Sequence, residues 1–244
     1  MCDKMNPERV TVNEEEKISN KVNYLKDVSS EFTKASISAK YSYNFSWLGR
    51  PIIQYPQDII AMQEIIWQVQ PDLIIETGIA HGGSLIFSAS MLELLGGEGK
   101  VVGIDIDIRS HNRTEIEKHP MFKRIVMIEG SSTDETIAEE VRQMAKGKRV
   151  LVFLDSNHTH EHALRELELY APMVSVGSYC VVFDTIIEDL PAGSFDDRPW
   201  DVGNNPKTAV WEYLKSHDEF VVDTEIENKI LITVAPDGYL KRVK

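Results

Sequence analysis

Cysteine is scarce in this sequence. The 244 residues include two cysteines, Cys2 near the amino terminus and Cys180 in the apolar run SYCVVF. Neither setting supports a disulfide bond, so we expect two free thiols. Long hydrophobic runs are also missing, because runs such as VLVFL at 150–154 fall far short of the roughly 20 residues that a membrane span needs. The amino terminus is polar and charged, unlike a secretory signal. We therefore expect a cytoplasmic protein with no membrane span.

Basic residues are few compared with acidic ones. The chain has 26 Lys and Arg against 39 Asp and Glu, which gives a net charge of −13. This charge repels a phosphate backbone, and no Lys/Arg cluster offsets it, so no nucleic-acid partner is expected. The hydrophobic content of 42% is enough for one large α/β domain or two small ones. The composition therefore favours chemistry on a small molecule.

Apolar runs alternate with helical patterns along most of the chain. Runs that are apolar throughout and are followed by helical segments indicate a parallel sheet covered on both faces. We therefore predict an α/β fold with a doubly wound, mostly parallel sheet and an antiparallel strand pair at the carboxyl terminus. The predicted strands are 72–77, 100–107, 124–130, 149–155 and 178–184, and the predicted helices are 57–70, 84–96, 134–146 and 160–171. The tail predicts two more strands joined by a turn around Asn228.

The amino-terminal part has a different character. Residues 12–40 lack Gly and Pro and carry apolar residues at loose helical spacing, which predicts one or two amphipathic helices with a structural role. Residues 43–58 are rich in aromatics, Gly and Pro, which predicts an ordered loop. We expect this helical extension and loop to form residues 1–55, and the α/β domain to form residues 56–244.

Acidic residues end the predicted strands. Ligands of doubly wound folds bind at the carboxyl ends of the strands, near the point where the strand order reverses. Five carboxylates would meet there, which solubility alone does not explain. They are Glu76, Asp105, Glu129, Asp155 and Asp184.

The loop TGIAHGGS at 77–84 admits several readings. It fits the dinucleotide fingerprint except that Ala80 replaces the middle glycine, and it lacks the Lys-Ser/Thr pair of a Walker loop. S-adenosylmethionine carries an amine and a positive charge, which suits Glu76, and its ribose diol suits Asp105. A glycine-rich turn without any ligand remains an alternative.

Several motifs resemble one known family. The runs WLGRPIIQYPQD, IIETGIAHGGS, GIDIDIR, EGSSTD, LDSNHTHEHALRELELYAPMVSVGSY and DGYL resemble the cephalosporin hydroxylase and rhamnosyl O-methyltransferase family over about residues 41–240. The resemblance implies a Rossmann-like class I methyltransferase that uses S-adenosylmethionine. The cofactor candidates are Glu76, Gly78, Ala80, His81, Gly82, Gly83, Ser84, Asp105 and Ser131.

The resemblance also implies a divalent-metal site, with Mg²⁺ as the expected ion. Asp155 and Asp184 occupy the strand ends where the family places its metal-binding acids, and we expect them to be ligands. The family commonly has another acid before the second one, whereas this chain has Phe183, so Glu188 or Asn157 is a candidate for the missing oxygen ligand. With Asp155, His158 is the catalytic candidate, because a histidine side chain suits proton transfer near neutral pH.

Other readings of the same residues stay open. His160 and His162 are expected to lie on a solvated helix capped by Thr159, and His158 has the same alternative. Asp155, His158 and His160 would suit an iron oxygenase, and loss of metal chemistry would leave a non-catalytic cofactor-binding subunit. Residues 185–206, with Phe195 and Trp200, and the aromatics near residue 45 are expected either to cover a sugar-containing or glycan-type acceptor or to pack the loop or a subunit interface. We also expect a homo-oligomer.

Overall fold

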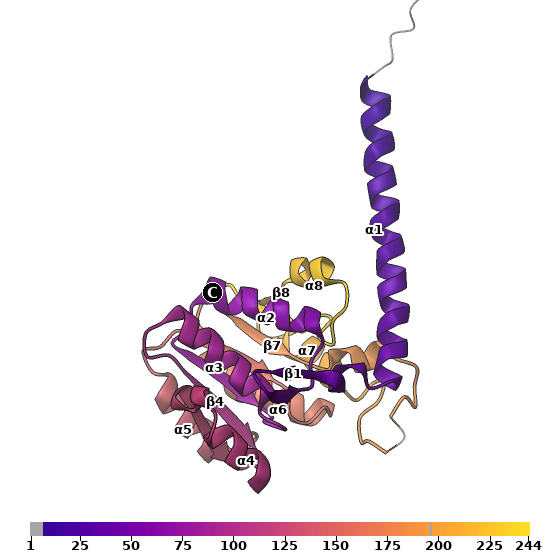
Figure 1. The fold of residues 1–244 in the computed structure, drawn as a ribbon. Helices are drawn as coiled ribbons and strands as arrows, with labels where there is room; N and C mark the ends of the chain where they lie inside the picture. The colour runs from indigo at the N-terminus through magenta and orange to yellow at the C-terminus, as the bar shows by residue number, and fades with distance from the viewer. Residues whose placement is uncertain (1–6, 196) are drawn as a thin grey trace, which may run out of the picture.

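The computed structural model of the protein describes residues 7–195 and 197–244, and side chains from residue 23 onward. Figure 1 shows the arrangement of the elements along the chain. The helices are α1 Pro7–Ser38, α2 Pro56–Val69, α3 Gly83–Leu95, α4 Ser110–Glu117, α5 Glu135–Ala145, α6 His160–Tyr170, α7 Pro206–Tyr213 and α8 Thr224–Ile230. The strands are β1 Phe45–Trp47, β2 Arg50–Ile52, β3 Leu73–Thr77, β4 Lys100–Asp105, β5 Ile125–Glu129, β6 Val150–Leu154, β7 Tyr179–Val182, β8 Phe220–Val222 and β9 Tyr239–Arg242. Short 3₁₀ turns are η1 Tyr41–Asn44, η2 Pro120–Arg124, η3 Ala171–Met173 and η4 Thr185–Asp189.

A seven-stranded sheet forms the centre of the molecule. Its strand order is β5-β4-β3-β6-β7-β9-β8, and the strands from β5 to β7 are parallel. β9 runs antiparallel to both β7 and β8. The chain builds outward from β3 through β4 to β5 and then crosses to β6 on the other side, so the strand order reverses between β3 and β6. The predicted fold class is confirmed.

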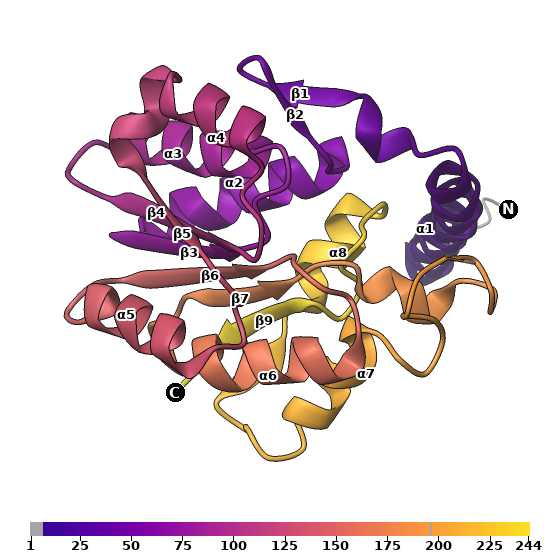
Figure 2. The same ribbon diagram turned by 90° about the horizontal axis from the view of Figure 1, so that it is seen from below.

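Helices cover both faces of this sheet. Figure 2 shows α2, α3 and α4 on one face and α5, α6 and α7 on the other. Ile74 packs with the first group of helices, whereas its neighbours Leu73 and Ile75 pack with the second. Successive side chains of a strand point to opposite faces, and both faces are buried here, which is why the strands are apolar throughout.

The carboxyl ends of the central strands are level with one another. Thr77 pairs with Leu154, and Leu154 pairs with Val182. The residues after Thr77, Leu154 and Val182 are therefore also level with one another across the sheet. The Asp155 amide donates to the Thr77 carbonyl at 3.0 Å, which links β3 to the residue after β6. This alignment brings the glycine loop beside Asp155 at the switch point.

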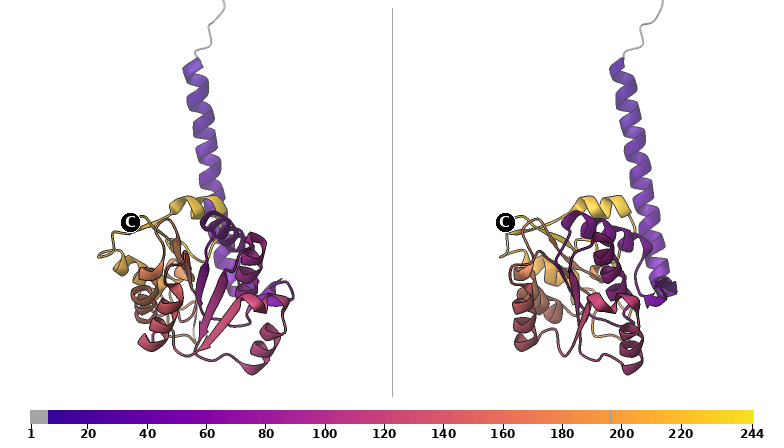
Figure 3. Two further views of the ribbon diagram at one scale, coloured as in Figure 1. Left: turned by 90° about the vertical axis from the view of Figure 1, so that its left-hand side faces the viewer. Right: turned by 60° about the vertical axis from the view of Figure 1, so that its left-hand side comes forward.

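From Pro7 to Ser38, the described part of the amino-terminal extension forms a single long helix, α1. Figures 1 and 3 show α1 running away from the α/β body, with its carboxyl-terminal end against it. Small polar residues on this end, such as Ser29 and Thr33, are buried, whereas Leu25, Val28 and Phe32 are at least 40% exposed. The described part of the chain has no helix with the length and apolar character that crossing a membrane requires. The division of the chain at residue 55 stays a prediction.

The segment predicted as a loop contains a β-hairpin. β1 and β2 pair around Leu48 and Gly49, both with positive φ, as a type I′ hairpin turn requires. The ring of Trp47 meets Phe87 of α3 edge-on at 4.9 Å, and its indole N–H donates to Ser90 Oγ at 3.0 Å. This aromatic side chain therefore packs the hairpin onto the body, which is one of the two expected roles.

The sequence pattern placed the turn and the second strand of the carboxyl-terminal pair incorrectly. The antiparallel pair exists, but Asn228 lies in helix α8 rather than in a turn, and the second strand begins at Tyr239. The Asp223 side chain caps α8 by accepting from the Glu225 amide. The Val234 amide donates to Asp58 at 3.0 Å instead of joining a strand, and Pro236 has no N–H to give a ladder.

Candidate functional site

The glycine loop joins β3 to α3 at the switch point. Because its three glycines have no side chain, atoms of neighbouring protein segments approach the loop backbone closely. A Cβ on Gly78 would lie 2.0 Å from the Asp155 carbonyl oxygen, one on Gly82 would lie 2.4 Å from Ile116, and one on Gly83 would lie 2.2 Å from the Pro51 carbonyl oxygen. The loop is therefore packed against β6, α4 and the hairpin at once.

We predict that Gly78→Ala destabilises the fold by about 3 kcal/mol, because the methyl group would overlap backbone atoms at a residue with positive φ. Gly96→Ala is the matched control, since Gly96 also has positive φ but has no atom within 4 Å of its ideal Cβ. The measurement is the midpoint of urea unfolding. Equal losses in the two variants would show that the close approach to Asp155 carries no cost.

Side chains from two other elements hold the backbone of this loop. The Arg50 Nε donates to the His81 carbonyl at 3.0 Å, and the Asn112 amide donates to the Ala80 carbonyl at 2.8 Å. Arg50 and Asn112 also bond each other at 3.0 Å. Ala80 has a φ of 45°, a region that costs a residue with a Cβ some energy, and these bonds stabilise it. Neither Arg50 nor Asn112 was singled out from the sequence.

Glu76 lies beneath the loop, 2% exposed. Ser84 Oγ donates to its Oε1, while its Oε2 is buried without a hydrogen-bond partner in the described structure. Burial raises the pKa of Glu76 to about 7. A small pocket beside the loop is lined by Asp155 and by residues of the hairpin end and of the loop, including Gln54, His81, Gly83 and Ser84.

A second and larger pocket lies on the other side of the loop. It has a volume of about 350 Å³, and Asp105, Ser131 and the 71% exposed Ile106 are among its lining residues. Asp105 Oδ2 accepts from the Ile79 amide at 2.8 Å and Oδ1 from the Asp107 amide at 3.1 Å. Each carboxylate oxygen accepts two hydrogen bonds, so Asp105 keeps acceptor capacity on Oδ1.

His162 lines this larger pocket, which corrects its expected place on a solvated helix face. Its Nε2 lies 3.1 Å from Ser132 Oγ and 3.0 Å from Ser156 Oγ. It also lies 3.3 Å from a carboxylate oxygen of Glu166, which is buried in the same helix. The sequence could have indicated this pairing, because Glu166 follows His162 by four residues and residues at i and i+4 share one helix face.

Asp155, His158 and Asp184 come together at the strand ends. One ligand atom from each lies within 4.8 Å of those of the other two. The His158 Nε2 is 3.1 Å from Asp184 Oδ2, and Gln54 Nε2 donates to Asp155 Oδ2 at 3.0 Å. Burial, together with the charge of Asp184, raises the pKa of Asp155 well above its usual range. Carboxylate and imidazole groups at this spacing can hold a divalent cation.

The other metal candidates lie elsewhere. His160 Nδ1 is 2.8 Å from Thr208 Oγ1 and its Nε2 is 3.3 Å from Glu212, so the two-histidine iron site does not form among the described residues. Asn157 Oδ1 accepts from the amide and hydroxyl of Thr159, which makes it part of the turn before α6. Glu129 ends β5 but pairs with Arg113 at 2.6 Å.

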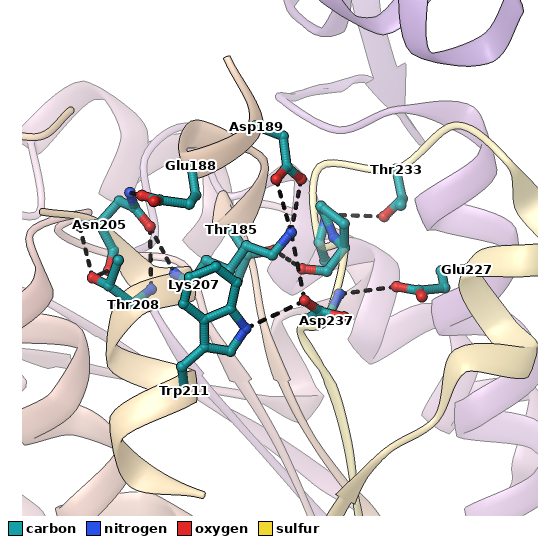
Figure 4. Close-up of polar contacts among 12 residues, drawn as sticks. Thr185, Glu188, Asp189, Asn205, Lys207, Thr208, Trp211, Glu227, Thr233 and Asp237 are labelled. Atoms are coloured by element: carbon teal, nitrogen blue, oxygen red, sulfur yellow. Dashed lines mark hydrogen bonds and ion pairs between the residues drawn. The ribbon is translucent and has the colours of Figure 1, made fainter. Parts of the chain in front are cut away.

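Glu188 belongs to a group of side chains that clamp, by hydrogen bonds and ion pairs, the two ends of the segment 190–204. Its Oε2 accepts from the Gly203 amide at 2.7 Å and from the Asn205 side chain. Figure 4 shows Lys207 beside this pair, with its ammonium between Asp189 at 2.8 Å and Asp237 at 3.5 Å. Glu188 is therefore occupied in fixing the segment rather than in completing the cluster of Asp155.

The fixed segment reaches back to that cluster. Trp200 meets the ring of His158 edge-on, with 4.7 Å between the ring centroids. Arg198 lies over the Trp200 ring at 5.3 Å. The His158 ring is thus in contact with an aromatic side chain from the segment that was predicted from the sequence as a candidate cover for the acceptor.

Comparison with known families covers nearly the whole α/β part of the chain. The family model described as rhamnosyl O-methyltransferase/CmcI matches residues 39–243. The chain belongs to this family. The resemblance drawn from the sequence motifs is therefore confirmed.

Relatives in the rhamnosyl O-methyltransferase/CmcI family include named enzymes. The chain is 34% identical over 192 residues to the rhamnosyl O-methyltransferase of Mycobacterium tuberculosis, covering 76% of this chain and 73% of that protein. It is 30% identical over 201 residues to the one of Mycobacterium leprae, covering 81% and 82%. A solved structure of CmcI-D160 with Mg and SAM has the same fold, with a TM-score of 0.59 and 19% identity over 83% of this chain and 78% of that one.

Phe183 is the departure from the acid pair that the sequence motifs suggest. Its ring is 2% exposed and packs edge-on against Phe153 at 6.1 Å. A side chain in this setting offers no ligand atom. In this member of the family, the described cluster therefore consists of two carboxylates and an imidazole.

Proposed function

We propose that this protein is an S-adenosylmethionine-dependent O-methyltransferase that acts on a hydroxyl of a sugar-containing metabolite or glycan precursor, assisted by a divalent ion such as Mg²⁺. One observation carries the proposal. Asp155 lines both pockets beside the glycine loop and also belongs to the cluster with His158 and Asp184. A cofactor in those pockets would therefore lie next to groups that can bind a metal ion and accept a proton.

The relatives support the choice of acceptor. Those from mycobacteria are rhamnosyl O-methyltransferases, and the chain covers more than two thirds of their length. A deoxysugar hydroxyl is therefore the first acceptor to test. The precursors of glycolipids, lipopolysaccharides and antibiotics all present such hydroxyls.

The residues at the loop fit the cofactor. The unpaired and buried Oε2 of Glu76 suits the positive end of S-adenosylmethionine. Asp105 retains an acceptor position for a ribose hydroxyl, and Ile106 offers an apolar surface for an adenine ring in the pocket that Ser131 also lines. Gly78, Ala80, His81, Gly83 and Ser84 form the wall between these groups.

The cluster fits a hard divalent ion. Asp155 and Asp184 would hold it with carboxylate oxygens, the ligand type that Mg²⁺ prefers. When bound, S-adenosylmethionine supplies an electrophilic methyl group, and the ion supplies a Lewis acid that lowers the pKa of an acceptor hydroxyl. Gln54 holds Asp155 in place through its amide N–H.

His158 is the proposed base. A carboxylate only accepts hydrogen bonds, so the contact of Nε2 with Asp184 places a proton on that nitrogen and leaves Nδ1 as the basic one. His158 would take the proton of the acceptor hydroxyl at Nδ1. Asp184 would stabilise the charged ring that results.

Trp200 is the proposed platform for the acceptor. It adjoins His158 and belongs to the clamped segment, so an acceptor that reaches His158 would contact its ring. We expect Trp200→Ala to raise the KM for the acceptor about tenfold, since aromatic contacts contribute on the order of 1 kcal/mol or more. The affinity for S-adenosylhomocysteine should stay unchanged.

The control for this prediction is Trp67→Ala, because Trp67 lies exposed on α2. Steady-state kinetics with one acceptor and saturating cofactor measure both variants. A loss of cofactor affinity in Trp200→Ala that equals the change in KM would contradict a role restricted to the acceptor.

Calorimetry and an activity assay test the proposed function together. Purified protein should bind S-adenosylmethionine and then transfer its methyl group to a rhamnoside only when a divalent ion is present. Cofactor binding without transfer to any glycoside would favour a non-catalytic subunit.

A homo-oligomer in the cytoplasm is part of the same proposal. The exposed apolar residues on α1, Tyr24, Leu25, Val28 and Phe32, support association through this helix. The cytoplasmic location rests on the sequence alone. Light scattering of the full chain tests the oligomer, and a monomer at micromolar concentration would contradict it.

A further inference from the structure

Gln54 is buried at the mouth of the smaller pocket with half of its amide group unused. Its side chain is 3% exposed and lines the pocket together with Ser84 and Asp155. Its Nε2 donates to Asp155 Oδ2 at 3.0 Å, while its Oε1 is buried without a hydrogen-bond partner in the described structure. A buried acceptor left unpaired is costly, so it points to a ligand that carries a donor.

The chemistry of the contact fixes the orientation of the amide. The NH₂ group of Gln54 donates, and the Asp155 carboxylate accepts, so the carbonyl oxygen must be the free end. With Asp155 ionised, as a metal ligand must be, a flipped amide would set two acceptor oxygens against each other. The free atom is therefore an acceptor, and its ligand must bring an N–H or O–H.

The neighbouring structure holds Gln54 in a fixed position. Tyr55 is buried beside it and its hydroxyl lies 2.6 Å from Ser36 Oγ of α1. On the other side, the Pro51 carbonyl approaches Gly83 so closely that a Cβ there would clash. Gln54 is thus anchored between α1 and the glycine loop, and a ligand would meet an acceptor that needs no rearrangement.

We infer that the Gln54 carbonyl oxygen binds the ammonium group of the amino-acid end of S-adenosylmethionine, while the amide N–H of the same residue holds Asp155. This inference rests on the proposed function. Gln54 and Ser84 both line the smaller pocket, and Ser84 donates to the buried carboxyl of Glu76, which favours a cation nearby when it is ionised. Glu76 itself is not among the residues that line the pocket, and among the described lining residues Gln54 is the one whose side chain has a buried, unpaired acceptor. One side chain would thereby connect the cofactor site to the metal-binding acid.

Two ligands test this inference without any turnover. S-adenosylhomocysteine carries the amino-acid end, and 5′-methylthioadenosine lacks it. We expect Gln54→Met, which has a similar shape and no acceptor oxygen, to bind S-adenosylhomocysteine about 10- to 100-fold more weakly by calorimetry, as loss of a hydrogen bond to a charged group predicts. The affinity for 5′-methylthioadenosine should change by less than about twofold, since the lost group makes no contact with it.

Two further variants complete the experiment. Gln54→Glu keeps an acceptor oxygen and, with its buried carboxyl protonated, also a donor to Asp155, so it should bind S-adenosylhomocysteine within about threefold of the unsubstituted protein. Gln57→Met is the matched control, because Gln57 also has a buried and unpaired carbonyl oxygen but lines neither pocket. It should bind both ligands normally.

The outcomes separate the inference from the proposed function. A selective loss for S-adenosylhomocysteine in Gln54→Met, restored in Gln54→Glu, supports the inference. An equal loss for both ligands, or no loss for either, overturns it while leaving the proposed function intact. If the unsubstituted protein binds neither ligand, both the proposed function and the inference are overturned.

Discussion

Asp155→Ala is expected to lower methyl transfer by about three orders of magnitude, because it removes several kcal/mol of charge stabilisation at the proposed metal site. Asp155 is also the acid that connects this site to the pockets. The affinity for S-adenosylhomocysteine should fall by less than about tenfold, since one hydrogen bond from Gln54 loses its acceptor but the loop keeps its other contacts. Single-turnover rates and calorimetry measure the two effects.

The fold supplies a matched control for Asp155. Glu129 also ends a strand at the same edge of the sheet, but it pairs with Arg113 and lies outside both pockets. Glu129→Ala should leave the rate of transfer unchanged. Equal losses of cofactor affinity and of rate in Asp155→Ala would contradict the separate roles of the loop and the cluster.

The affinity for the cofactor is expected to rise with pH as Glu76 ionises. Burial raises the pKa of Glu76 from 4.5 to about 7 in the folded protein. Below that pH the buried carboxyl is mostly neutral, and above it the carboxylate attracts the positive end of the cofactor. The affinity for S-adenosylhomocysteine should increase up to about tenfold per pH unit below 7 and level off above it.

The stability of the cofactor-free protein should follow the opposite course. A raised carboxyl pKa means that the neutral form is favoured on folding. The contribution of Glu76 to the free energy of unfolding is therefore fully present below pH 4.5 and is lost as the pH rises through about 7. Thermal unfolding between pH 5 and pH 8 tests this loss of stability. Glu76→Gln is the comparison, because the glutamine side chain does not titrate.

Glu76→Gln should also flatten the pH dependence of cofactor affinity, and Glu76→Ala should weaken binding at every pH. Asp105 is the acid to compare with Glu76, since it ends the adjacent strand β4 and accepts hydrogen bonds from the amides of Ile79 and Asp107. An unchanged slope in Glu76→Gln would assign the pH dependence to another group and would contradict the proposed role of Glu76.

Much of the architecture follows from the sequence because burial on both faces makes each central strand apolar throughout. The order of strands and helices, the glycine loop and the row of acids could all be predicted in this way. Asp155 directly follows β6 and Asp184 lies two residues beyond the end of the neighbouring β7, so their meeting with His158 at one edge of the sheet follows from the topology.

The remaining features depend on tertiary contacts that the local pattern does not encode. Gln54, Arg50 and Asn112 come from the hairpin end and from α4, and they reach the loop only because its glycines allow close packing. The tail shows the same limit, since Asp58 takes the Val234 amide from a segment whose apolar pattern resembles a strand. Local propensity is overridden there by a buried carboxylate.

Methyl transfer to a rhamnoside is the most direct test of the proposed function. Mass spectrometry of a rhamnosyl acceptor after incubation with the protein, S-adenosylmethionine and Mg²⁺ should show the gain of one CH₂ unit on a hydroxyl, together with S-adenosylhomocysteine. The product should be absent when Mg²⁺ is removed by a chelator and when Asp155 is replaced by alanine. Tight cofactor binding with no methylated product from any sugar hydroxyl would contradict the proposed function.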